Sequence, residues 1–544
     1  MFIEPVFGKK FFGREEVLGT LHKRVTALKG GYRQNLALAG PMLVGKSSIL
    51  RHFLSNVKDA EVIPLYIEMG EGDFRLFSVR FMATLLYNYL KSVSKKSEGD
   101  FEDLKKTCYG LIPKTMRQVD EVCKLVSGKK ENAAYEKLLN ITSVFKEETG
   151  KSCLVVLDEF HNLANLNLKK PFQIFGKYIM IQKNTMYIVS SSQKNLLRDI
   201  LSQKLSLLFG NFEVIEVDGF DSQTAKSFVS SKMRDERIEE SVKDYLIQIT
   251  QGNPFYLEAF ANRFSEAVKH SGNKYHAKEC LLSAFSDLLY ESNGILNQYF
   301  TNNIHFFLEK RSRKRFIPIL LAIANGKNTV KAIQRELGKA DPELSVELKS
   351  LQEMDLIYPS GIFYKISERL FEYWLKYVYS LKTKSMIDDL DIKFLEFKQL
   401  IGDDFDEFSR FSGENVNEII AGLFKKFNNE KVRIGMKCRI MPKFDKVEVK
   451  HVTGNIHAIT GKLGGKSWLC YVKQNGIADD RDINDLWTAK RVHDSSSIAR
   501  KIFIPLKGIE QNAFLLAKEQ NIWVWDTQTL NGILRLFSKF ELVL

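Results

Sequence analysis

The sequence lacks the features that mark secreted and membrane-spanning proteins. Its six cysteines form no CxxC pair and none has a second ligand at zinc spacing, which favours reduced thiols. No apolar run reaches about 18 residues, the length that crosses a bilayer, and the longest is Phe316–Ala324. The first residues contain neither the apolar segment nor the cleavage site of a secretory leader. We therefore expect a cytoplasmic protein without a membrane partner.

Composition excludes several further classes of protein. Hydrophobic residues make up 44% and charged residues 27% of the 544 residues, which rules out disordered, collagen-like and mucin-like chains. The length corresponds to about three or four domains. Lys and Arg number 80 against 66 Asp and Glu, so the formal net charge is +14. This surplus permits an anionic partner such as nucleic acid, but it does not require one.

A phosphate-binding loop is the strongest motif in the sequence. The apolar run Gln34–Ala39 is typical of a strand, and it leads into GPMLVGKSS at Gly40–Ser48 and then into an apolar helix pattern. The glycines let backbone N–H groups point at phosphates, and the helix N-terminus adds positive potential. We expect Lys46 to reach the β- and γ-phosphates of ATP and Ser47 to bind Mg²⁺. The predicted nucleotide contacts in this loop are Gly40, Pro41, Val44, Gly45, Lys46, Ser47 and Ser48.

A second apolar run, Ser152–Leu157, precedes two acidic residues. An uninterrupted apolar run suits a parallel strand that is covered on both faces. At the end of such a strand, Asp158 would support the Mg²⁺ and Glu159 would orient or activate the attacking water. We therefore predict that Glu159, Asp158 and Lys46 are catalytic and that Ser47 and Asp158 hold the metal. The alternative is an ordinary strand followed by two surface acids.

A third apolar run, Met186–Val189, ends in three consecutive serines. A polar side chain at this point is placed to contact the γ-phosphate or the attacking water, and Ser192 is the candidate. Three serines after a strand also suit an ordinary loop. The sequence does not decide between these two interpretations.

The order of these motifs resembles a known family. FFGREEVLGTL at Phe11–Leu21 precedes the phosphate loop, and QGNPFYLEAFA at Gln251–Ala261 follows the third strand. This series, over roughly residues 5–265, resembles the archaeal-type ATPases of the STAND branch of AAA+-like P-loop proteins. The resemblance implies that Gly13 and Arg14, with Glu15, help to hold the adenine side of the nucleotide. It also implies that the segment Gly252–Pro254 approaches the nucleotide from a helical lid, and Pro254 is the predicted contact.

One departure from the family pattern concerns an arginine. The family usually has an Arg just before the strand that leads to the lid, whereas this chain has Asn211. The departure predicts slow hydrolysis, and it motivates an alternative in which the chain is an ATP-gated scaffold that hydrolyses little or no ATP. Arg198 is a substitute for the missing group, but we interpret it as a surface helix residue.

Residues 221–300 and 301–380 are predicted to form an all-α lid and a winged-helix domain. The winged-helix domain is predicted from three helix patterns followed by a turn between short strands. This order resembles the winged helices attached to these ATPases. The third helix, Asp341–Ile357, carries five acidic residues against the single Lys349, so phosphate would repel it. It therefore suits a partner protein better than DNA. The basic cluster Arg311–Arg315 suits phosphate better, or is a solvated face.

Residues 381–544 are predicted to hold an acidic helical linker and a basic α/β domain that resembles PD-(D/E)xK restriction-endonuclease-like domains. Nuclease chemistry needs carboxylates on two strands to bind metal, but these positions are His457 and Tyr471, and only Lys473 remains. We therefore predict no nuclease activity. The domain either grips duplex DNA or serves packing and oligomerisation. The candidate DNA contacts are Lys446, Lys450, Lys466, Lys473, Lys490 and Arg491.

Together these patterns predict an α/β P-loop NTPase core over residues 1–220, with a parallel sheet between helices, followed by the lid, the winged helix and the nuclease-like domain. The predicted function is a molecular switch that binds ATP or ADP with Mg²⁺, hydrolyses ATP slowly, and couples nucleotide state to binding of DNA or a partner protein. The scaffold without hydrolysis is the first alternative and an active nuclease the second. The sequence does not decide whether the chain forms a homo-oligomer.

Overall fold

The computed structural model describes residues 4–57, 59, 61–70, 72–95, 99–205, 212–233, 238–272, 276–308, 315–338, 341–384, 389–435, 437–453, 456–488 and 497–544. The chain divides into two compact units. The first is Met1–Phe220 with the short segments Asn253–Phe255 and Glu353–Asp355, and the second comprises the remaining residues. Within the described ranges, no helix has the length and apolar character needed to cross a membrane.

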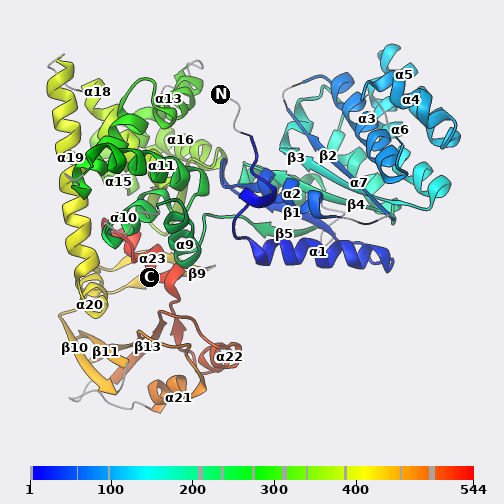
Figure 1. The fold of residues 1–544 in the computed structure, drawn as a ribbon. Helices are drawn as coiled ribbons and strands as arrows, with labels where there is room; N and C mark the ends of the chain where they lie inside the picture. Colours follow the sequence, from blue (N-terminus) through cyan, green and yellow to red (C-terminus); the bar gives the residue numbers. More distant parts are fainter. Residues whose placement is uncertain are drawn as a thin grey trace. The chain divides into compact units, whose positions relative to one another are not determined.

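A parallel five-stranded sheet forms the centre of the first unit (Figure 1). Its strand order is β2-β3-β4-β1-β5, and every neighbouring pair is parallel. The strands are β1 (Asn35–Ala39), β2 (Val62–Glu68), β3 (Ser152–Asp158), β4 (Thr185–Ser191) and β5 (Phe212–Glu216). The three apolar runs of the sequence correspond to β1, β3 and β4, which confirms the predicted parallel core.

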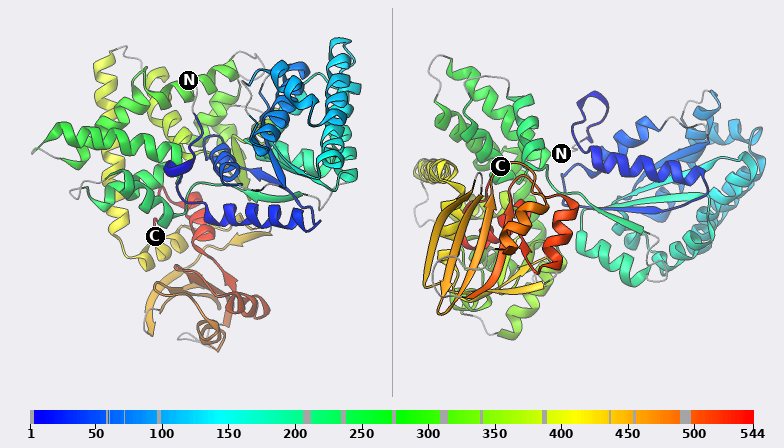
Figure 2. Two further views of the ribbon diagram at one scale, coloured as in Figure 1. Left: turned by 45° about the vertical axis from the view of Figure 1, so that its right-hand side comes forward. Right: turned by 90° about the horizontal axis from the view of Figure 1, so that it is seen from below.

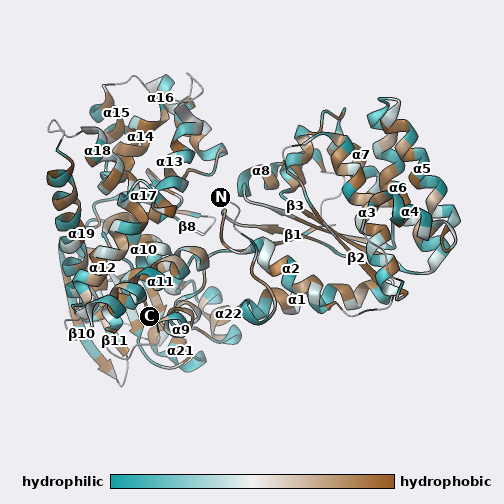
Figure 3. Cartoon of the chain, turned by 45° about the horizontal axis from the view of Figure 1, so that its top comes forward, coloured by the Kyte–Doolittle hydropathy of each residue, from teal (hydrophilic) through white to brown (hydrophobic). Residues whose placement is uncertain are grey.

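Helices cover both faces of this sheet. Along β1, Leu36 and Leu38 pack with α1 and α2, whereas Ala37 and Ala39 face the core that includes α3 to α7. This alternation buries the inner strands β1, β3 and β4 along their whole length, and the helices that cover them keep one polar side (Figure 3). The helices are α1 (Glu15–Lys29), α2 (Lys46–Asn56), α3 (Phe74–Ser92), α4 (Phe101–Tyr109), α5 (Pro113–Ser127), α6 (Glu131–Thr149), α7 (Pro171–Ile181) and α8 (Lys194–Asp199).

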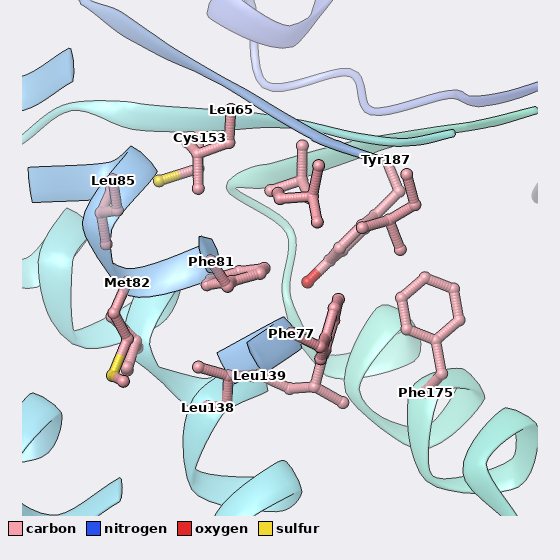
Figure 4. Packing of buried hydrophobic residues seen from close by; sticks show 14 of the residues in the cluster. Leu65, Phe77, Phe81, Met82, Leu85, Leu138, Leu139, Cys153, Phe175 and Tyr187 are labelled. Atoms are coloured by element: carbon pink, nitrogen blue, oxygen red, sulfur yellow. The ribbon is translucent and has the colours of Figure 1, made fainter. Parts of the chain in front are cut away.

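The larger of the two cores lies beneath an insertion of four helices, α3 to α6, between β2 and β3. Leu65 of β2, Cys153 of β3 and Tyr187 of β4 face these helices, and the ring of Tyr187 packs at 5.0 Å from the ring of Phe175 (Figure 4). Phe81 of α3 is buried in the same cluster. The sequence motifs did not predict this insertion. Its residues follow the apolar periodicity of core helices and include no recognisable catalytic or binding motif.

The first part of the second unit is helical. It consists of α9 (Ser222–Lys232), α10 (Glu240–Thr250), α11 (Pro254–Ser271), α12 (Ala277–Phe285), α13 (Ile295–Leu308), α14 (Phe316–Ala324), α15 (Val330–Leu337), α16 (Asp341–Glu353), α17 (Arg369–Trp374) and α18 (Ser380–Lys384). A hairpin of β6 (Ile357–Ser360) and β7 (Phe363–Ile366) follows α16. Three helices and a hairpin thus occur in the expected order, and their identification as a winged helix stays a prediction.

A second, mixed sheet ends the chain, with strand order β10-β11-β12-β13-β14 (Figure 2). The pairs β10–β11 and β11–β12 are antiparallel, and β12–β13 and β13–β14 are parallel. Its strands are β10 (Lys446–Thr453), β11 (Ile456–Leu463), β12 (Lys466–Lys473), β13 (Ser497–Pro505) and β14 (Trp523–Val524). The helices α19 (Leu390–Gly413) and α20 (Val416–Lys426) precede it.

The two faces of this second sheet are covered by different elements. One face packs with α20, with α23 (Thr527–Phe537) and with a hairpin of β8 (Glu430–Ile434) and β9 (Lys437–Met441). The other packs with α21 (Asp480–Thr488) and α22 (Gln511–Glu519). The hairpin was not predicted from the sequence, whereas the strands and helices that follow it agree with the predicted α/β domain.

A buried carboxylate joins the helical part of the second unit to the end of the chain. Asp404 of α19 is 2% exposed. Its Oδ2 accepts hydrogen bonds from the hydroxyls of Tyr373 at 2.6 Å and Tyr245 at 2.7 Å, and its Oδ1 from Tyr377 at 2.9 Å. The Lys539 ammonium lies 2.8 Å from Oδ1. Burial alone would raise the pKa of Asp404, but the hydrogen bonds from Lys539 and Tyr373 hold it below its usual 3.8.

We predict that Asp404→Asn lowers the unfolding free energy at pH 7 by about 3 kcal/mol, because buried hydroxyls and an ammonium lose their anionic partner. A depressed pKa gives stability that is present above the unfolded-state value of about 3.9 and is lost as pH falls through the folded-state value. Thermal unfolding at pH 7 and in acid measures both effects, and the exposed neighbour Asp403→Asn is the control. Equal effects of the two substitutions would contradict this role of Asp404.

Candidate nucleotide-binding site

The phosphate loop connects β1 to α2 and needs glycine at a close approach of backbones. The Gly40 N–H donates to the Ser191 carbonyl at 3.3 Å. A Cβ at Gly40 would lie 2.2 Å from the Val217 carbonyl oxygen, which no side chain tolerates. Gly45 has a φ of 97° at the start of α2, a conformation that favours glycine. The motif spacing therefore reflects both a steric and a conformational requirement.

Lys46 is the first residue of α2 and is 4% exposed. Its Nζ donates to the carbonyl oxygens of Gly40 and Pro41, both at 2.9 Å. Burial lowers its pKa, and the charges of Glu159 and Asp158 oppose that shift. In the part of the chain that the structure describes, no carboxylate lies within ion-pair distance of this ammonium. A buried cation with only neutral partners is suited to an anionic ligand such as a phosphate.

Asp158 ends β3 and gathers hydroxyls from three elements. It is 1% exposed. Its Oδ2 accepts from Ser47 Oγ of α2 at 2.6 Å and from the Tyr66 hydroxyl of β2 at 2.5 Å, and its Oδ1 accepts from Ser190 Oγ of β4. Burial and the negative charge of Asp158 raise the pKa of Tyr66, so the phenol stays a donor. Ser47 and Asp158 thus place two hard oxygens together, a donor set that fits Mg²⁺.

Glu159 follows Asp158 with a φ of 52° and faces the end of β4. Its Oε2 accepts from the Ser192 backbone N–H at 2.9 Å and from Ser192 Oγ at 2.8 Å. His161 Nδ1 lies 3.3 Å from the same oxygen and 2.9 Å from Ser191 Oγ. Burial lowers the pKa of His161, which favours the neutral imidazole, although the charge of Glu159 acts the other way. Ser192 therefore contacts the proposed water-orienting acid directly.

Arg14 braces the phosphate loop from outside. Its Nη2 donates to the Val44 carbonyl at 3.1 Å and to the Asp218 carbonyl at 2.6 Å, and its guanidinium lies 4.7 Å from the centroid of the Phe220 ring. Gly13 and Arg14 both have positive φ, so the chain bends sharply just before α1. The resemblance places these residues on the adenine side of the nucleotide, and the contacts seen here connect the loop to the chain after β5.

Several other predicted residues have partners of their own. The Ser48 hydroxyl accepts from the Val6 N–H at 3.0 Å. Pro254 begins α11, where the Asn253 side chain accepts from the Phe255 N–H at 3.0 Å. Arg198 forms an ion pair with Glu216. Asn211 lies outside the described residues.

Two contacts at this site were missed in the sequence. Tyr66 stands in an apolar strand pattern, VIPLYIE, where a tyrosine is an ordinary strand residue. His161 follows the acidic pair by two positions, and nothing in its neighbourhood distinguishes it from a loop histidine. Both reach the site only because β2, β3 and β4 are adjacent in the sheet. Strand order, which the motifs do not encode, was the missing information.

The part of the chain that is predicted to resemble a nuclease contains an ion pair at one of the predicted positions. Lys473 Nζ, at the end of β12, lies 2.6 Å from Asp482 Oδ2 of α21. His457 of β11 is opposite Val472, and Tyr471 is buried. Over the described ranges of the chain, no three or more His, Cys, Asp or Glu residues are grouped so that they could hold a metal ion. The absence of nuclease activity stays a prediction.

Comparison with known proteins assigns the first part of the chain. Residues 11–260 match the family model described as an ATPase domain predominantly from Archaea. This region is similar to that family of ATPase domains, which supports the general prediction of a P-loop ATPase. A comparison with curated proteins found no match.

Solved structures show distant similarity. The Walker-type ATPase paby2304 of Pyrococcus abyssi is 20% identical, with a TM-score of 0.47 over 68% of this chain and 97% of that protein. The ORC2 protein of Aeropyrum pernix, in ADPNP–ADP complexes, is 10% identical, with a TM-score of 0.42 over 70% of this chain and 98% of that protein. The RuvB Holliday junction branch migration motor of Thermotoga maritima is 12% identical, with a TM-score of 0.32 over 68% and 98%.

We predict that Gly40→Ala removes ATP binding and lowers the unfolding free energy of the first unit by about 1–3 kcal/mol, because the new Cβ forces the loop away from Val217. Gly19→Ala is the matched control, since a Cβ there meets no atom within 4 Å. Because Gly19 lies in a helix, this substitution should raise the unfolding free energy by up to about 1 kcal/mol. Thermal unfolding and equilibrium ATP binding measure both variants. Unchanged ATP affinity in Gly40→Ala would contradict the steric account.

Proposed function

We propose that the chain is a Mg²⁺-dependent ATPase that acts as a molecular switch, with ATP bound by the loop between β1 and α2. The observation that carries this proposal is the buried ammonium of Lys46, which has two carbonyl partners and, within the described ranges, no carboxylate partner. An anionic phosphate satisfies that charge better than two neutral carbonyls do. The family match over residues 11–260 supports the same assignment.

The residues around the loop divide the chemistry between them. Lys46 exchanges its carbonyl partners for phosphate oxygens, and the backbone N–H groups of the glycine-rich loop add further donors. Ser47 and Asp158 would hold Mg²⁺, directly or through water. Mg²⁺ supplies positive charge that stabilises the negative charge on the phosphates as the terminal bond breaks. Tyr66 and Ser190 keep the Asp158 carboxylate oriented, because each donates a hydrogen bond to it.

Glu159 is the residue that orients the attacking water. In this arrangement its Oε2 accepts two hydrogen bonds from Ser192, at 2.9 and 2.8 Å. These hydrogen bonds occupy Oε2 and fix the carboxylate, so that only Oε1 can accept from a water proton, and hydrolysis is slow until this contact changes. The contact gives the switch a physical basis, since any ligand that moves the end of β4 changes the environment of Glu159.

The output of the switch is binding of DNA or of a partner protein by the second unit. The basic surplus in the C-terminal part of the sequence supports DNA, whereas the acidic residues of α16 support a protein partner. The alternative is an ATP-gated scaffold with little or no turnover. The Glu159–Ser192 contact and the residue Asn211 both favour slow chemistry, and therefore keep that alternative in place. An active nuclease is the least supported function, because Lys473 is paired with Asp482.

Steady-state ATP turnover, with and without duplex DNA, tests the proposal. We expect measurable turnover that Glu159→Gln reduces by at least about a hundredfold, within the range for loss of acid–base catalysis, while ATP affinity stays unchanged. Glu213→Gln is the control, because Glu213 pairs with Arg24 on β5 and α1. Stimulation by DNA would support the DNA output. If the wild type and Glu159→Gln bind ATP and have equal turnover, the ATPase proposal is contradicted and the ATP-gated scaffold is favoured.

A further inference from the structure

Two arginines meet on one indole ring in the C-terminal sheet. The guanidinium carbon of Arg439 on β9 lies 4.7 Å from the centroid of the Trp523 ring on β14, and that of Arg500 on β13 lies 4.4 Å from it. The ring of Trp468 on β12 packs edge-on against Trp523 at 5.4 Å. Two positive charges are thus held near each other by contacts with the same aromatic side chain.

Among the described arginines of the second unit that are partly or fully buried, these two lack an acidic partner. Arg369 forms an ion pair with Glu541 at 2.7 Å, and the buried Arg535 lies 3.6 Å from Glu372. Over the described ranges, by contrast, neither Arg439 nor Arg500 has an ion pair, and Arg500 has only the Asn521 amide oxygen at 3.4 Å.

The electrostatics of Arg500 reflect this missing partner. Burial lowers its pKa, and the positive charge of Arg439 lowers it further. Two like charges that repel each other in a half-buried place are stabilised when an anion binds between or beside them. Arginine forks match the geometry of phosphate oxygens better than an ammonium does. The pair is therefore suited to a phosphate group.

A third cation extends this site along the sheet. Lys466, the first residue of β12, is exposed and is opposite Ser497, while Trp468 is opposite Arg500 on the same two strands. No side-chain partner is found for Lys466 among the described residues. Cations from β9, β12 and β13 thus lie at one end of the sheet. A run of phosphates suits three such groups better than a single phosphate does.

We propose that Arg439, Arg500 and Lys466 bind the phosphodiester backbone of DNA. Trp523 is half-buried and contacts two guanidiniums, and Trp468 is 9% exposed, so neither ring is open enough for a base to stack on it. Recognition is therefore by backbone charge, independent of sequence and sensitive to salt. This inference rests on the DNA output of the proposed function, and it is separate from ATP binding.

The site differs from the set of lysines that composition alone suggested. Lys446 forms an ion pair with Glu448 at 2.7 Å, and Lys473 forms one with Asp482 at 2.6 Å. Lys490 and Arg491 lie outside the described residues. Of that earlier set, Lys466 belongs to the proposed site and Lys450 remains an exposed cation on β10.

Fluorescence anisotropy of labelled DNA, duplex or single-stranded and of arbitrary sequence, tests the site in the full chain over a range of salt concentrations. We expect R439Q/R500Q to bind at least tenfold more weakly. With duplex DNA, the slope of log affinity against log salt should fall by about 2, because each phosphate contact contributes about 0.9. K507Q/K518Q is the matched control: it removes the same charge from exposed residues at and near α22, and we expect its affinity to stay within twofold of wild type.

R439K/R500K keeps both charges, and it keeps the test valid if the glutamine variant is less stable. We expect R439K/R500K to retain most of the salt slope. Turnover of ATP without DNA should be the same in all variants. If R439Q/R500Q binds DNA with the affinity and salt slope of the wild type, the proposed site is wrong, although the chain still binds DNA. No binding of DNA by the wild type would overturn both, with turnover still reporting on the ATPase. Binding to vesicles of anionic phospholipid, lost in R439Q/R500Q, in place of DNA binding would also overturn the proposal.

Discussion

The nucleotide site depends on one buried carboxylate at the end of β3. Asp158 accepts hydrogen bonds from Ser47 on α2, Tyr66 on β2 and Ser190 on β4, so that a single side chain connects three elements. Because the strands are parallel, the residues at their carboxyl ends meet at one edge of the sheet. The helix that carries the phosphate loop is thereby fixed to the sheet, and the oxygens that suit Mg²⁺ are already together.

Charge balance links the two places where we propose that phosphate binds. Many half-buried or buried cations in the described parts of the chain have an acidic partner, as Arg369 and Lys473 do. Lys46 in the first unit, and Arg439 with Arg500 in the second, have none there. An unpaired cation that is partly removed from water is costly, and an anionic ligand offsets that cost. The same physical reasoning therefore assigns a nucleotide to one site and a DNA backbone to the other.

Local motifs predicted most of the nucleotide site, and tertiary contacts supplied the rest. The phosphate loop and the acidic pair after β3 are short continuous segments, so their residues were identified by number. Tyr66, His161 and the contact between Ser192 and Glu159 depend on which strands are neighbours, and no local pattern encodes this order. The insertion α3 to α6 and the hairpin β8–β9 were missed for a related reason, since they carry core residues and turns without a recognisable motif.

The central claim is that the loop between β1 and α2 binds ATP with Mg²⁺, and one measurement tests it most directly. Thermal unfolding of the wild type and of Lys46→Met is followed with and without ATP and Mg²⁺. The account predicts that ligand at about 100 times its dissociation constant stabilises the wild type by about 2.7 kcal/mol, whereas Lys46→Met gains little. An equal stabilisation of both proteins would contradict the account, because ATP would then bind without the buried ammonium.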